Sequence, residues 1–511
     1  MILKNADAAL RHWATARGND VALRSGATTM TYARLNHVVD DIAARLEALG
    51  VQRCAILLDN GPGWVAADLA LRRIGGVIVP IPLFFSAEQM AHALGTAGAD
   101  AIITDDVGTR RLAIGPGIPL GAAEEIAAIR LCRLDLPTVA LPEGTQKITF
   151  TSGTTGRPKG VCLSAAGIDQ VARALCAATE GTMSDRHLSI MPFAALLENI
   201  AGIDIPLLAG AEFYPVPLGE IGFSGSSGLQ PAQLMAAIDR YRPTSIVTVP
   251  QILAVLMTLA ERAGWRPDYL RHVAVGGAVL AQGTIAKARS LGLPAYEGYG
   301  LSECASVVAL NTRAADCPDS VGKPLPHCRV ELAPDAEVLV YGSAALGYLG
   351  GDEPLTLSPD GAIATGDLGR IDADGFLHLV GRKKNMFITA FGRNVAPDWV
   401  ESELMAQPAI AQAFVHGEAR PWNAAIIVPS PALMAQQEVD FRRLIATAID
   451  EVNAKLPDYA RVRSWILADQ PFLTTNNLLT WNGRLRRREI EALYRDRLDR
   501  LYEKDKQHVY G

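Results

Sequence analysis

Residues 149–160, with the sequence TFTSGTTGRPKG, decide more about this chain than any other stretch of it. The core TSGTTGRPKG (151–160) has four hydroxyl side chains, three glycines and a lysine, and it follows an apolar run typical of a β-strand. Glycines let backbone N–H groups turn toward one point, and hydroxyls and an ammonium add further donors. The pattern therefore predicts a loop that wraps a polyphosphate, with these candidate ligands: Thr151, Ser152, Gly153, Thr154, Thr155, Gly156 and Lys159.

Taken alone, a cluster of Ser, Thr and Gly is more often a polar surface turn. The stretch is also not a Walker-type loop, because Pro158 and Gly160 flank Lys159 where that motif requires Gly and then Ser or Thr. The interpretation as a phosphate loop therefore depends on the other motifs of the chain.

Length and composition indicate a globular protein with more than one domain. The chain has 511 residues, of which 49% are apolar and 20% are charged, and its net charge of −6 offers no general attraction to nucleic acid. Seven scattered cysteines, none in a C-x-x-C pair, favour reduced thiols over disulfides or a zinc site. With no apolar run long enough to span a bilayer and no signal-peptide pattern, we expect a cytoplasmic protein.

Alternation of strand-length and helix-length segments predicts an α/β fold. Apolar runs at Cys54–Leu58, Val77–Ile81, Ser189–Phe193, Glu212–Val216, Ser245–Val249 and Val273–Gly276 are separated by amphipathic segments such as Trp64–Arg73, Leu196–Ala209 and Ile252–Ala263. This order is typical of βαβ units and largely parallel sheets covered by helices. From Pro326 the pattern changes to short strands with Gly and Asp turns, and beyond Gly381 to a smaller α+β pattern. We expect a domain of residues 1–383 and a second of residues 384–511.

Four further stretches carry polar residues directly after predicted strands: Gly276-Gly277-Ala278, the run Tyr296–Glu303 (YEGYGLSE), the run Ala364–Gly369 (ATGDLG) and the run Gly381–Lys384 (GRKK). Each alone is weak, since a Gly pair is common in turns, an Asp forms turns, and three basic residues are usually solvated surface. Together with the 151–160 loop, and in this order, they closely resemble the acyl-adenylate-forming superfamily. That superfamily comprises acyl-CoA synthetases, aryl-CoA ligases, luciferases and peptide-synthetase adenylation domains.

The resemblance spans nearly the whole chain and implies a fold, a reaction and roles for residues. It implies a large N-terminal domain of βαβ layers with a small β-barrel-like part, a small mobile C-terminal domain, and activation of a carboxylic acid with ATP and Mg²⁺. In the implied site Tyr299 lies along the adenine, Ser302 reaches the α-phosphate and Glu303 holds Mg²⁺. The same resemblance assigns nucleotide contacts to Gly276, Gly277, Ala278, Glu297, Gly298, Gly300, Asp367 (ribose hydroxyls) and Arg382 (ribose), and makes Lys384 the hinge.

Two departures from the superfamily pattern bear on substrate and catalysis. Ala195 stands where many members carry His, although Glu198 fits the long-chain acyl-CoA synthetase version, and no Asp is present there to pair an α-ammonium. We therefore expect a hydrophobic acid, fatty or aryl, in a pocket formed by Phe193, Ala194, Ala195, Val249 and Gly277. The second departure is Arg484, which occupies the place of the superfamily's C-terminal catalytic lysine and keeps its charge but not its geometry.

Three functions remain open from the sequence. The adenylate could pass to a thiol, either that of CoA or the phosphopantetheine arm of an acyl carrier protein. It could instead pass to an amine or other nitrogen nucleophile in a biosynthetic pathway. Finally, the chain could be a nucleotide-binding pseudoenzyme that Arg484 has inactivated. We favour the first, because the other motifs of the site are intact.

Overall fold

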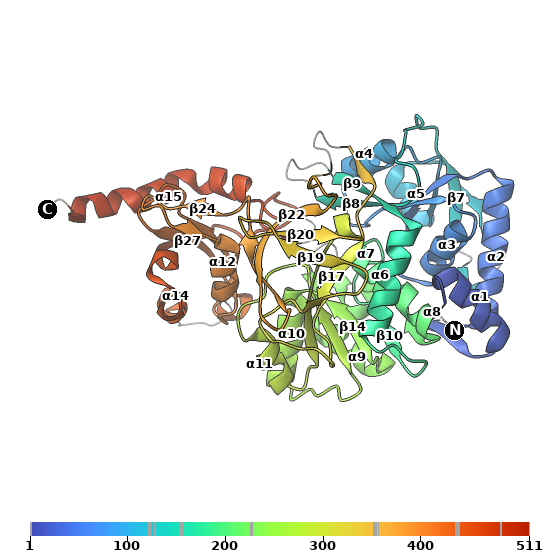
Figure 1. The fold of residues 1–511 in the computed structure, drawn as a ribbon, viewed down its shortest axis with the longest axis horizontal. Coiled ribbons are helices and arrows are strands. Elements are labelled where there is room, and N and C mark those ends of the chain that lie inside the picture. Colours follow the sequence, from blue (N-terminus) through green and yellow to red (C-terminus); the bar gives the residue numbers. More distant parts are fainter. Residues whose placement is uncertain are drawn as a thin grey trace.

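The computed structural model describes residues 3–120, 124–126, 129–152, 158–224, 228–350, 355, 357–434, 440–480 and 483–509. It is a mixed α/β protein with a large N-terminal domain and a small C-terminal domain, which confirms the expected fold class. Figure 1 shows the two domains side by side, with the chain termini at opposite ends of the molecule.

The first sheet of the large domain presents the phosphate-loop stretch. It has eight strands in the order β21 (Gly347–Leu349), β9 (Pro158–Ser164), β8 (Thr145–Ser152), β4 (Val77–Pro80), β3 (Arg53–Leu57), β5 (Ala101–Thr104), β7 (Arg130–Arg133) and β6 (Ile118–Pro119). The strands β8, β4, β3 and β5 run parallel, whereas β8 and β9 pair antiparallel with Thr151 opposite Lys159. The predicted loop thus connects two strands of one hairpin.

The second sheet carries the adenine and acid motifs at the ends of its strands. Its nine strands are ordered β18 (Lys323–Pro324), β17 (Ser306–Leu310), β16 (Ala295–Leu301), β15 (His272–Val275), β14 (Ser245–Thr248), β10 (Arg186–Leu188), β11 (Glu212–Tyr214), β1 (Val21–Ser25) and β2 (Thr28–Thr31). Strands β16 through β1 pair parallel, as the βαβ pattern predicted. A separate two-stranded sheet joins β12 (Phe223–Ser224) and β13 (Gly228–Leu229).

Helices cover both sheets and begin at polar or proline residues. The Thr31 side chain accepts from the backbone N–H of Arg34 at the start of α2, and Ser86 and Gln89 form a capping box at α4. The helices of this domain are α1 (Ala6–Ala16), α2 (Tyr32–Ala48), α3 (Pro62–Arg73), α4 (Ala87–Ala97), α5 (Asp106–Leu112), α6 (Ala165–Ala178), α7 (Leu196–Asn199), the π-helical η2 (Ile200–Asp204), α8 (Ile205–Ala209), α9 (Pro231–Tyr241), α10 (Pro250–Arg262) and α11 (Thr284–Ser290), with 3-10 turns η1 (Glu124–Ile126), η3 (Leu218–Ile221) and η4 (Ser302–Cys304).

The structure corrects the strand that the sequence predicts at Ser189–Phe193, because the strand in this region, β10, lies at Arg186–Leu188. The strand β10 ends at Leu188, and beyond Ser189 the Asn60 side chain, rather than a neighbouring strand, bonds to the backbone of Met191 and Phe193. Asn60 Nδ2 donates to the carbonyl of Met191 over 2.8 Å, and the N–H of Phe193 donates to Asn60 Oδ1 over 2.8 Å. Pro192, which has no N–H, lies between them.

After β18 the chain forms an antiparallel four-stranded sheet in the order β19 (Arg329–Leu332), β20 (Glu337–Tyr341), β22 (Ile363–Ile371) and β23 (Leu377–Arg382). The barrel-like part predicted for this region takes the form of this open sheet. Asp367 of β22 is paired with Arg382 of β23. The last two sequence motifs are therefore neighbours across one hairpin.

The C-terminal domain packs its helices on one three-stranded sheet. Its elements are β24 (Phe387–Ile388), β25 (Asn394–Val395), α12 (Pro397–Met405), β26 (Ile410–His416), β27 (Asn423–Pro429), α13 (Pro431–Met434), α14 (Phe441–Lys455), η5 (Asp458–Ala460), β28 (Val462–Leu467) and α15 (Arg487–Val509). A separate apolar core, which includes Val400, Ile427 and Ile449, lies between α12, the sheet and α14. The domain boundary at residues 383/384 and the mobility of this domain remain predictions.

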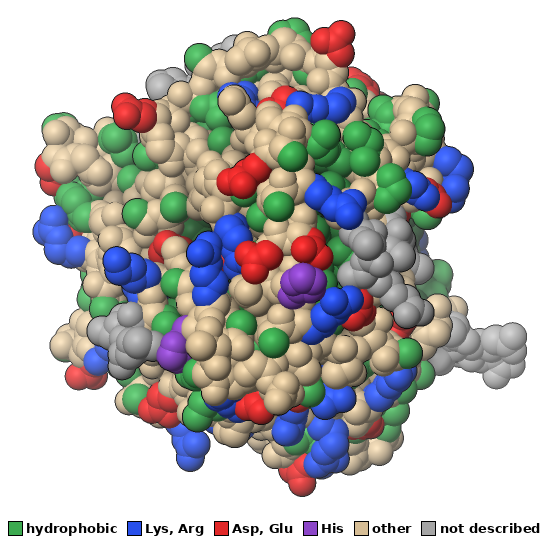
Figure 2. All heavy atoms as spheres, turned by 90° about the vertical axis from the view of Figure 1, so that its right-hand side faces the viewer, with side chains coloured by type: hydrophobic (Ala, Val, Ile, Leu, Met, Phe, Trp, Pro, Cys, Tyr) green, Lys and Arg blue, Asp and Glu red, His purple; other side chains and the backbone are tan. Residues whose placement is uncertain are grey.

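The exposed surface of the large domain carries mixed charge. Figure 2 shows basic and acidic side chains interspersed over the face that it draws. Among the described residues, none of the helices is both long and apolar enough to cross a bilayer.

Candidate functional site

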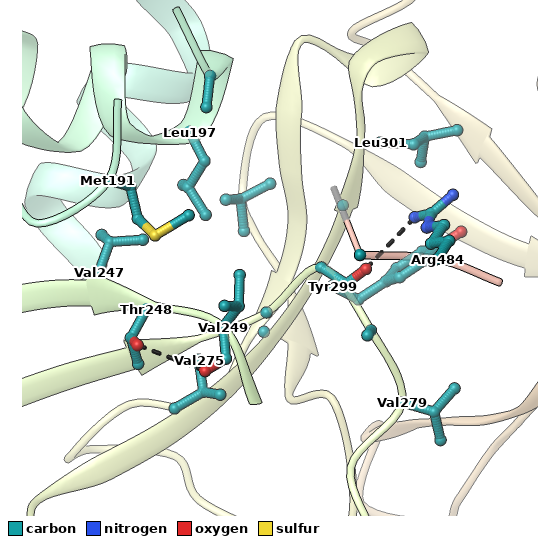
Figure 3. A pocket seen from close by; sticks show the side chains of 18 of the residues that line it. Met191, Leu197, Val247, Thr248, Val249, Val275, Val279, Tyr299, Leu301 and Arg484 are labelled. Atoms are coloured by element: carbon teal, nitrogen blue, oxygen red, sulfur yellow. Dashed lines mark hydrogen bonds between the residues drawn. The ribbon is translucent and has the colours of Figure 1, made fainter. Parts of the chain in front are cut away.

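One large cavity lies where the two sheets of the N-terminal domain, the β22–β23 hairpin and the C-terminal domain meet. Its volume is about 2810 Å³, well above the roughly 300–1,000 Å³ of a site for one small molecule. Figure 3 shows one side of it lined by apolar residues, among them Met191, Val247 and Val249, and the other side by Tyr299 and Arg484. The cavity can therefore hold more than one ligand, with different chemistry at its two ends.

A buried carboxylate organises the polar end. Asp367, which is 5% exposed, has its Oδ1 2.7 Å from Nε of Arg382, and its Oδ2 accepts a 2.6 Å hydrogen bond from the Tyr299 hydroxyl. Burial raises the pKa of Asp367, while the Arg382 guanidinium opposes that rise. Within β22, Gly366 adopts a φ of +71°, which favours glycine, directly before Asp367. The structure thus brings three residues of separate sequence motifs into one cluster.

The phosphate-loop stretch faces a second acidic residue across a tyrosine. Lys159 Nζ lies 3.3 Å from the centroid of the Tyr348 ring, and the Tyr348 hydroxyl donates a 2.7 Å hydrogen bond to Oε1 of Glu303. Tyr348 reaches this place because β21 pairs with β9 next to Val161. Thr151 and Lys159 both line the cavity, whereas Ser152 is described only as the end of β8, and Gly153, Thr154, Thr155 and Gly156 lie outside the described residues.

Glu303 is suited to hold a magnesium ion beside bound phosphates. Glu303 lines the cavity, and its carboxylate accepts a hydrogen bond from the Tyr348 hydroxyl. The ammonium of Lys159 lies over the ring of the same tyrosine. Mg²⁺ is usually bound by one or two carboxylates together with phosphate oxygens and water. The residues present therefore fit Mg²⁺, with Glu303 as the protein ligand.

The glycines of the adenine motifs are required by close backbone contacts. Gly277 has a φ of +91°, and a Cβ at Gly300 would lie 2.0 Å from the carbonyl oxygen of Ser306. The predicted residues of these motifs line the cavity, namely Gly276, Gly277, Ala278, Glu297, Gly298, Gly300 and Ser302. These motifs meet because Val275 of β15 pairs with Glu297 of β16.

Glu297, a half-buried acid in this part of the site, has a strongly raised pKa. Its removal from water, with a smaller contribution from the charge of Asp319, raises its pKa to about 8. It is therefore mostly neutral at pH 7 and can donate a hydrogen bond as well as accept one. A neutral carboxyl fits better than a carboxylate near the uncharged ring of a nucleoside.

The C-terminal domain contributes Arg484 to the cavity. Its Nη2 donates to the carbonyl oxygen of Gly277 over 3.4 Å, and its backbone N–H donates to the Thr480 hydroxyl over 3.0 Å. The side chain is open to the water of the cavity, but the protein mass around it and the nearby Arg382 lower its pKa from the ordinary arginine value. Lys384, the predicted hinge, lies in the turn directly after β23 and also lines the cavity.

Apolar side chains line the first part of the other end of the cavity, and polar and charged side chains line its continuation. Ala194, Ala195, Val249 and Gly277 line it as predicted. The lining continues along β10, β14 and β15 through His187, Ser245 and Ala274 to Thr179 and Arg271. It thus contains residues from both ends of these three strands.

Phe193 does not line this cavity, which corrects the predicted pocket. It is 1% exposed and packs in the core of the N-terminal domain, where its ring centroid lies 5.1 Å from that of Trp64. Its backbone N–H donates to Asn60 Oδ1, which holds this segment against the N-terminal core.

Sequence reasoning missed Tyr348, and it named Glu198 without its buried partner His187. His187 Nε2 lies 3.0 Å from Oε1 of Glu198, and its Nδ1 lies 3.0 Å from the Ser245 hydroxyl. Oε2 of Glu198 accepts from the N–H of Met191 over 3.3 Å. The pair thereby fixes the wall of the apolar end. Neither a lone Tyr in a short strand nor a His 11 residues before a Glu carries a pattern that could have indicated these contacts.

Comparisons with known proteins identify the family and the fold. Residues 10–345 match the sequence profile described as AMP-binding enzyme, and residues 384–506 match that of the AMP-binding enzyme C-terminal domain. Over 570 aligned positions, the chain is 27% identical to the long-chain-fatty-acid–CoA ligase FadD15 of Mycobacterium bovis, with 94% of this chain and 93% of that protein covered. It is 28% identical to a feruloyl-CoA synthase of Amycolatopsis sp., with 91% and 95% covered. Its fold is similar to that of the anthranilate CoA ligase AuaEII, solved with anthranoyl-AMP, at a TM-score of 0.80 and 20% identity, with 96% and 98% covered.

Proposed function

The chain belongs to the AMP-binding enzyme family, and we propose that it uses ATP to adenylate a hydrophobic carboxylic acid and then transfers the acyl group to the thiol of CoA. The observation that supports this most directly is a single cavity that joins the Tyr299–Asp367–Arg382 cluster to an apolar channel. A nucleotide fits the first part and the acid the second, so that the carboxylate meets the α-phosphate between them.

In the first half-reaction a carboxylate oxygen attacks the α-phosphorus of ATP. The bond from that phosphorus to the bridging oxygen of the β-phosphate breaks, and pyrophosphate leaves. Asp367 accepts from the ribose hydroxyls, and Lys159 with the 151–160 loop binds the phosphates. Glu303 holds Mg²⁺, which when bound neutralises phosphate charge.

Arg484 brings the two anionic reactants together. A carboxylate and a phosphate repel each other, and a guanidinium can donate to one oxygen of each. Arg484 already lies in the cavity, with the charges of Asp367 and Glu303 acting on it. This arrangement favours an active enzyme over a pseudoenzyme.

In the second half-reaction the thiolate attacks the acyl carbonyl carbon, the bond to the AMP oxygen breaks, and AMP leaves. We propose that the C-terminal domain, residues 384–511, rotates about Lys384 between the two half-reactions, as the resemblance to the superfamily implies. Replacing Lys384 with Pro, which fixes φ, should slow one half-reaction more than the other. Equal loss of both, or of neither, would contradict the hinge.

We propose a fatty acid as the first choice of substrate. The cavity continues past the apolar Met191, Val247 and Val249 along three strands, which leaves room for a chain longer than a compact ring. Long-chain-fatty-acid–CoA ligases stand among the relatives, and an aryl acid is the alternative because a feruloyl-CoA synthase also does.

Pyrophosphate exchange across a panel of acids tests the proposal. Fatty acids of increasing length, aryl acids and amino acids are each incubated with enzyme, ATP, Mg²⁺ and labelled pyrophosphate. We expect exchange with fatty acids and none above background with amino acids. CoA, a phosphopantetheine-bearing carrier protein and a simple amine are then added separately to the active acid. If none of the acids gives exchange, the chain is a pseudoenzyme. If product forms only with the carrier protein or only with the amine, that compound and not CoA is the acceptor.

A further inference from the structure

Three metal-binding side chains gather where the loop after β17 meets the β22–β23 hairpin. Cys317, Asp372 and His378 each offer a ligand atom, and these atoms lie within 4.8 Å of one another. Within the described part of the chain, no other group of three His, Cys, Asp or Glu side chains comes this close. The three are half-buried, so that an ion from solvent can reach them. None of them belongs to the motifs of the proposed reaction.

The hydrogen bonds of His378 leave one ring nitrogen facing the carboxylate. His378 Nδ1 lies 3.2 Å from the backbone carbonyl oxygen of Asp319, and its Nε2 lies 2.9 Å from Oδ2 of Asp372. An imidazole nitrogen and a carboxylate oxygen are both metal ligands. A metal ion bound between Nε2 and Oδ2 would take the place of the proton in this contact.

The Asp372 carboxylate is already oriented for a single metal bond. Its Oδ1 accepts from the backbone N–H of Asp374 over 3.1 Å and from that of Phe376 over 2.9 Å. These bonds fix the carboxylate in the turn of the hairpin. Oδ2 is the oxygen that remains for His378 or for an ion.

The loop that carries Cys317 is held by its own hydrogen bonds. The N–H of Cys317 donates to Oδ1 of the buried Asn311 over 2.9 Å, and its carbonyl accepts from the Ser320 hydroxyl over 2.7 Å. Asp319 has a φ of +69°, which is uncommon for a residue other than glycine and which the loop maintains. The thiol and the carbonyl that orients His378 are therefore both positioned before any ion binds.

From this geometry we propose that Cys317 Sγ, Asp372 Oδ2 and His378 Nε2 form a binding site for Zn²⁺. Sulfur, nitrogen and oxygen together are typical zinc ligands, whereas Mg²⁺ and Ca²⁺ prefer oxygen alone. A zinc-bound His usually donates its other N–H to a carbonyl or carboxylate, as His378 does to Asp319. Zn–N and Zn–O bonds of roughly 2.0–2.1 Å need only a small opening of the present contact.

This site would link two segments that border the nucleotide cavity. The hairpin that carries Asp372 and His378 also carries Asp367 and Arg382, and His378 itself lines the cavity. The loop carries Asp319, whose charge contributes to the raised pKa of Glu297. The proposal concerns binding of the ion and is independent of the adenylation reaction.

Metal analysis of the whole protein tests the site. The purified chain is stripped with chelator, incubated with Zn²⁺, dialysed, and assayed for zinc per chain. Co²⁺ is loaded in parallel, because a thiolate bound to cobalt gives a charge-transfer band in the near ultraviolet. We expect one tightly held equivalent of zinc and a thiolate band, both lost in Cys317→Ser and in His378→Gln. Cys176→Ser, which removes a half-buried thiol of α6, is the matched control and should keep both.

Circular dichroism and thermal unfolding establish that each variant is folded before its metal content is compared. Absence of tightly bound zinc in the parent overturns the proposal and leaves a hydrogen-bonded contact between His378 and Asp372. Zinc retained in Cys317→Ser, or lost equally in Cys176→Ser, overturns it as well. A cobalt complex without the thiolate band removes Cys317 from the site.

Discussion

The Tyr299 hydroxyl donates a 2.6 Å hydrogen bond to Oδ2 of Asp367, although the two residues lie 68 positions apart in the chain. Arg382 holds the other oxygen of the same carboxylate. The carboxylate is therefore shared between an aromatic side chain predicted to lie along the adenine and a cation predicted to lie on the ribose. Both contacts orient Asp367 before a nucleotide binds.

Asp367→Asn should weaken the use of ATP much more than the binding of the acid. The amide keeps the shape but loses the charge that pairs with Arg382, and one NH₂ replaces an acceptor. We expect a loss of about 2–4 kcal/mol, the scale for a charge-assisted contact in a site, seen as a fall in kcat/KM for ATP in pyrophosphate exchange. Asp496→Asn, an exposed residue of α15, is the control. A similar fall in that control, or an unchanged KM for ATP, would contradict this role.

Glu303→Gln should reduce activity chiefly by weakening the binding of Mg²⁺. The amide cannot supply the anionic oxygen that Mg²⁺ prefers, although it can still accept from Tyr348. We expect activity to fall by about 30-fold or more, which corresponds to about 2 kcal/mol, and higher Mg²⁺ to restore part of it. Lys159→Ala should lower activity without that response to Mg²⁺. Unchanged exchange in Glu303→Gln would remove the residue from the site.

Tyr348→Phe separates the two contacts of that tyrosine. The variant keeps the ring beneath Lys159 but loses the 2.7 Å hydrogen bond to Glu303. We expect a smaller loss than in Glu303→Gln, and a change in the Mg²⁺ dependence of exchange. A full loss of activity with unchanged Mg²⁺ dependence would argue that the hydroxyl acts elsewhere.

Ala274→Phe should restrict the enzyme to shorter acids. Ala274 lines the elongated part of the cavity in the middle of β15, next to Val247 of β14. A phenyl ring there blocks the channel, so exchange with long acids should fall by about tenfold or more, while short acids remain substrates. Ala274→Ser, which adds little volume, should leave the chain-length profile unchanged. If Ala274→Phe has the same profile as the parent, the acid does not extend past this strand.

The pKa of Glu297 predicts how stability depends on pH. Because that pKa is raised to about 8 from 4.5, the folded protein binds this proton more tightly than the unfolded chain does. Stability from this group is therefore complete below about pH 4.5 and is lost as pH rises toward 8. Each unit of difference between the folded and the unfolded pKa corresponds to about 1.4 kcal/mol of stability. The loss of stability from Glu297 is smaller than this conversion gives, because the side chain is partly exposed to solvent.

Glu297→Gln removes this titration. Thermal unfolding measured between pH 5 and 9 should show the parent losing more stability than the variant over this interval. Parallel curves for the two proteins would mean that Glu297 has an ordinary pKa in the folded state.

Local patterns in the sequence were sufficient for the fold class and for most of the strands, whereas the roles of the site residues stay predictions. Asp367 lies in the middle of β22, Tyr299 lies within β16 and Arg382 ends β23, and the hairpin pairing of β22 with β23 brings Asp367 and Arg382 together. Phe193 was misassigned because a large apolar side chain beside small ones suggests a pocket, whereas its ring packs in the core against the distant Trp64. The contacts of Tyr348 and His187 were missed because their partners, Glu303 in η4 and Glu198 in α7, belong to other elements of the fold.

Arg484 carries the prediction that separates an active enzyme from an inactive one. It belongs to the C-terminal domain, yet its guanidinium contacts Gly277 over 3.4 Å and its charge acts on Asp367. In this pose it can neutralise both the incoming carboxylate and the α-phosphate. Arg484→Ala should therefore remove most pyrophosphate exchange, whereas transfer to CoA from a supplied acyl-adenylate should be largely retained if the proposed rotation moves this residue away.

Arg484→Lys is the informative companion to this variant. A lysine keeps the charge but provides one point of contact in place of a planar fork. We expect it to be active, with a rate at or above that of the parent. Exchange in Arg484→Ala equal to the parent would show that another group is the catalytic cation. If the parent is inactive with every acid tested while Arg484→Lys is active, then the arginine has made this chain a pseudoenzyme.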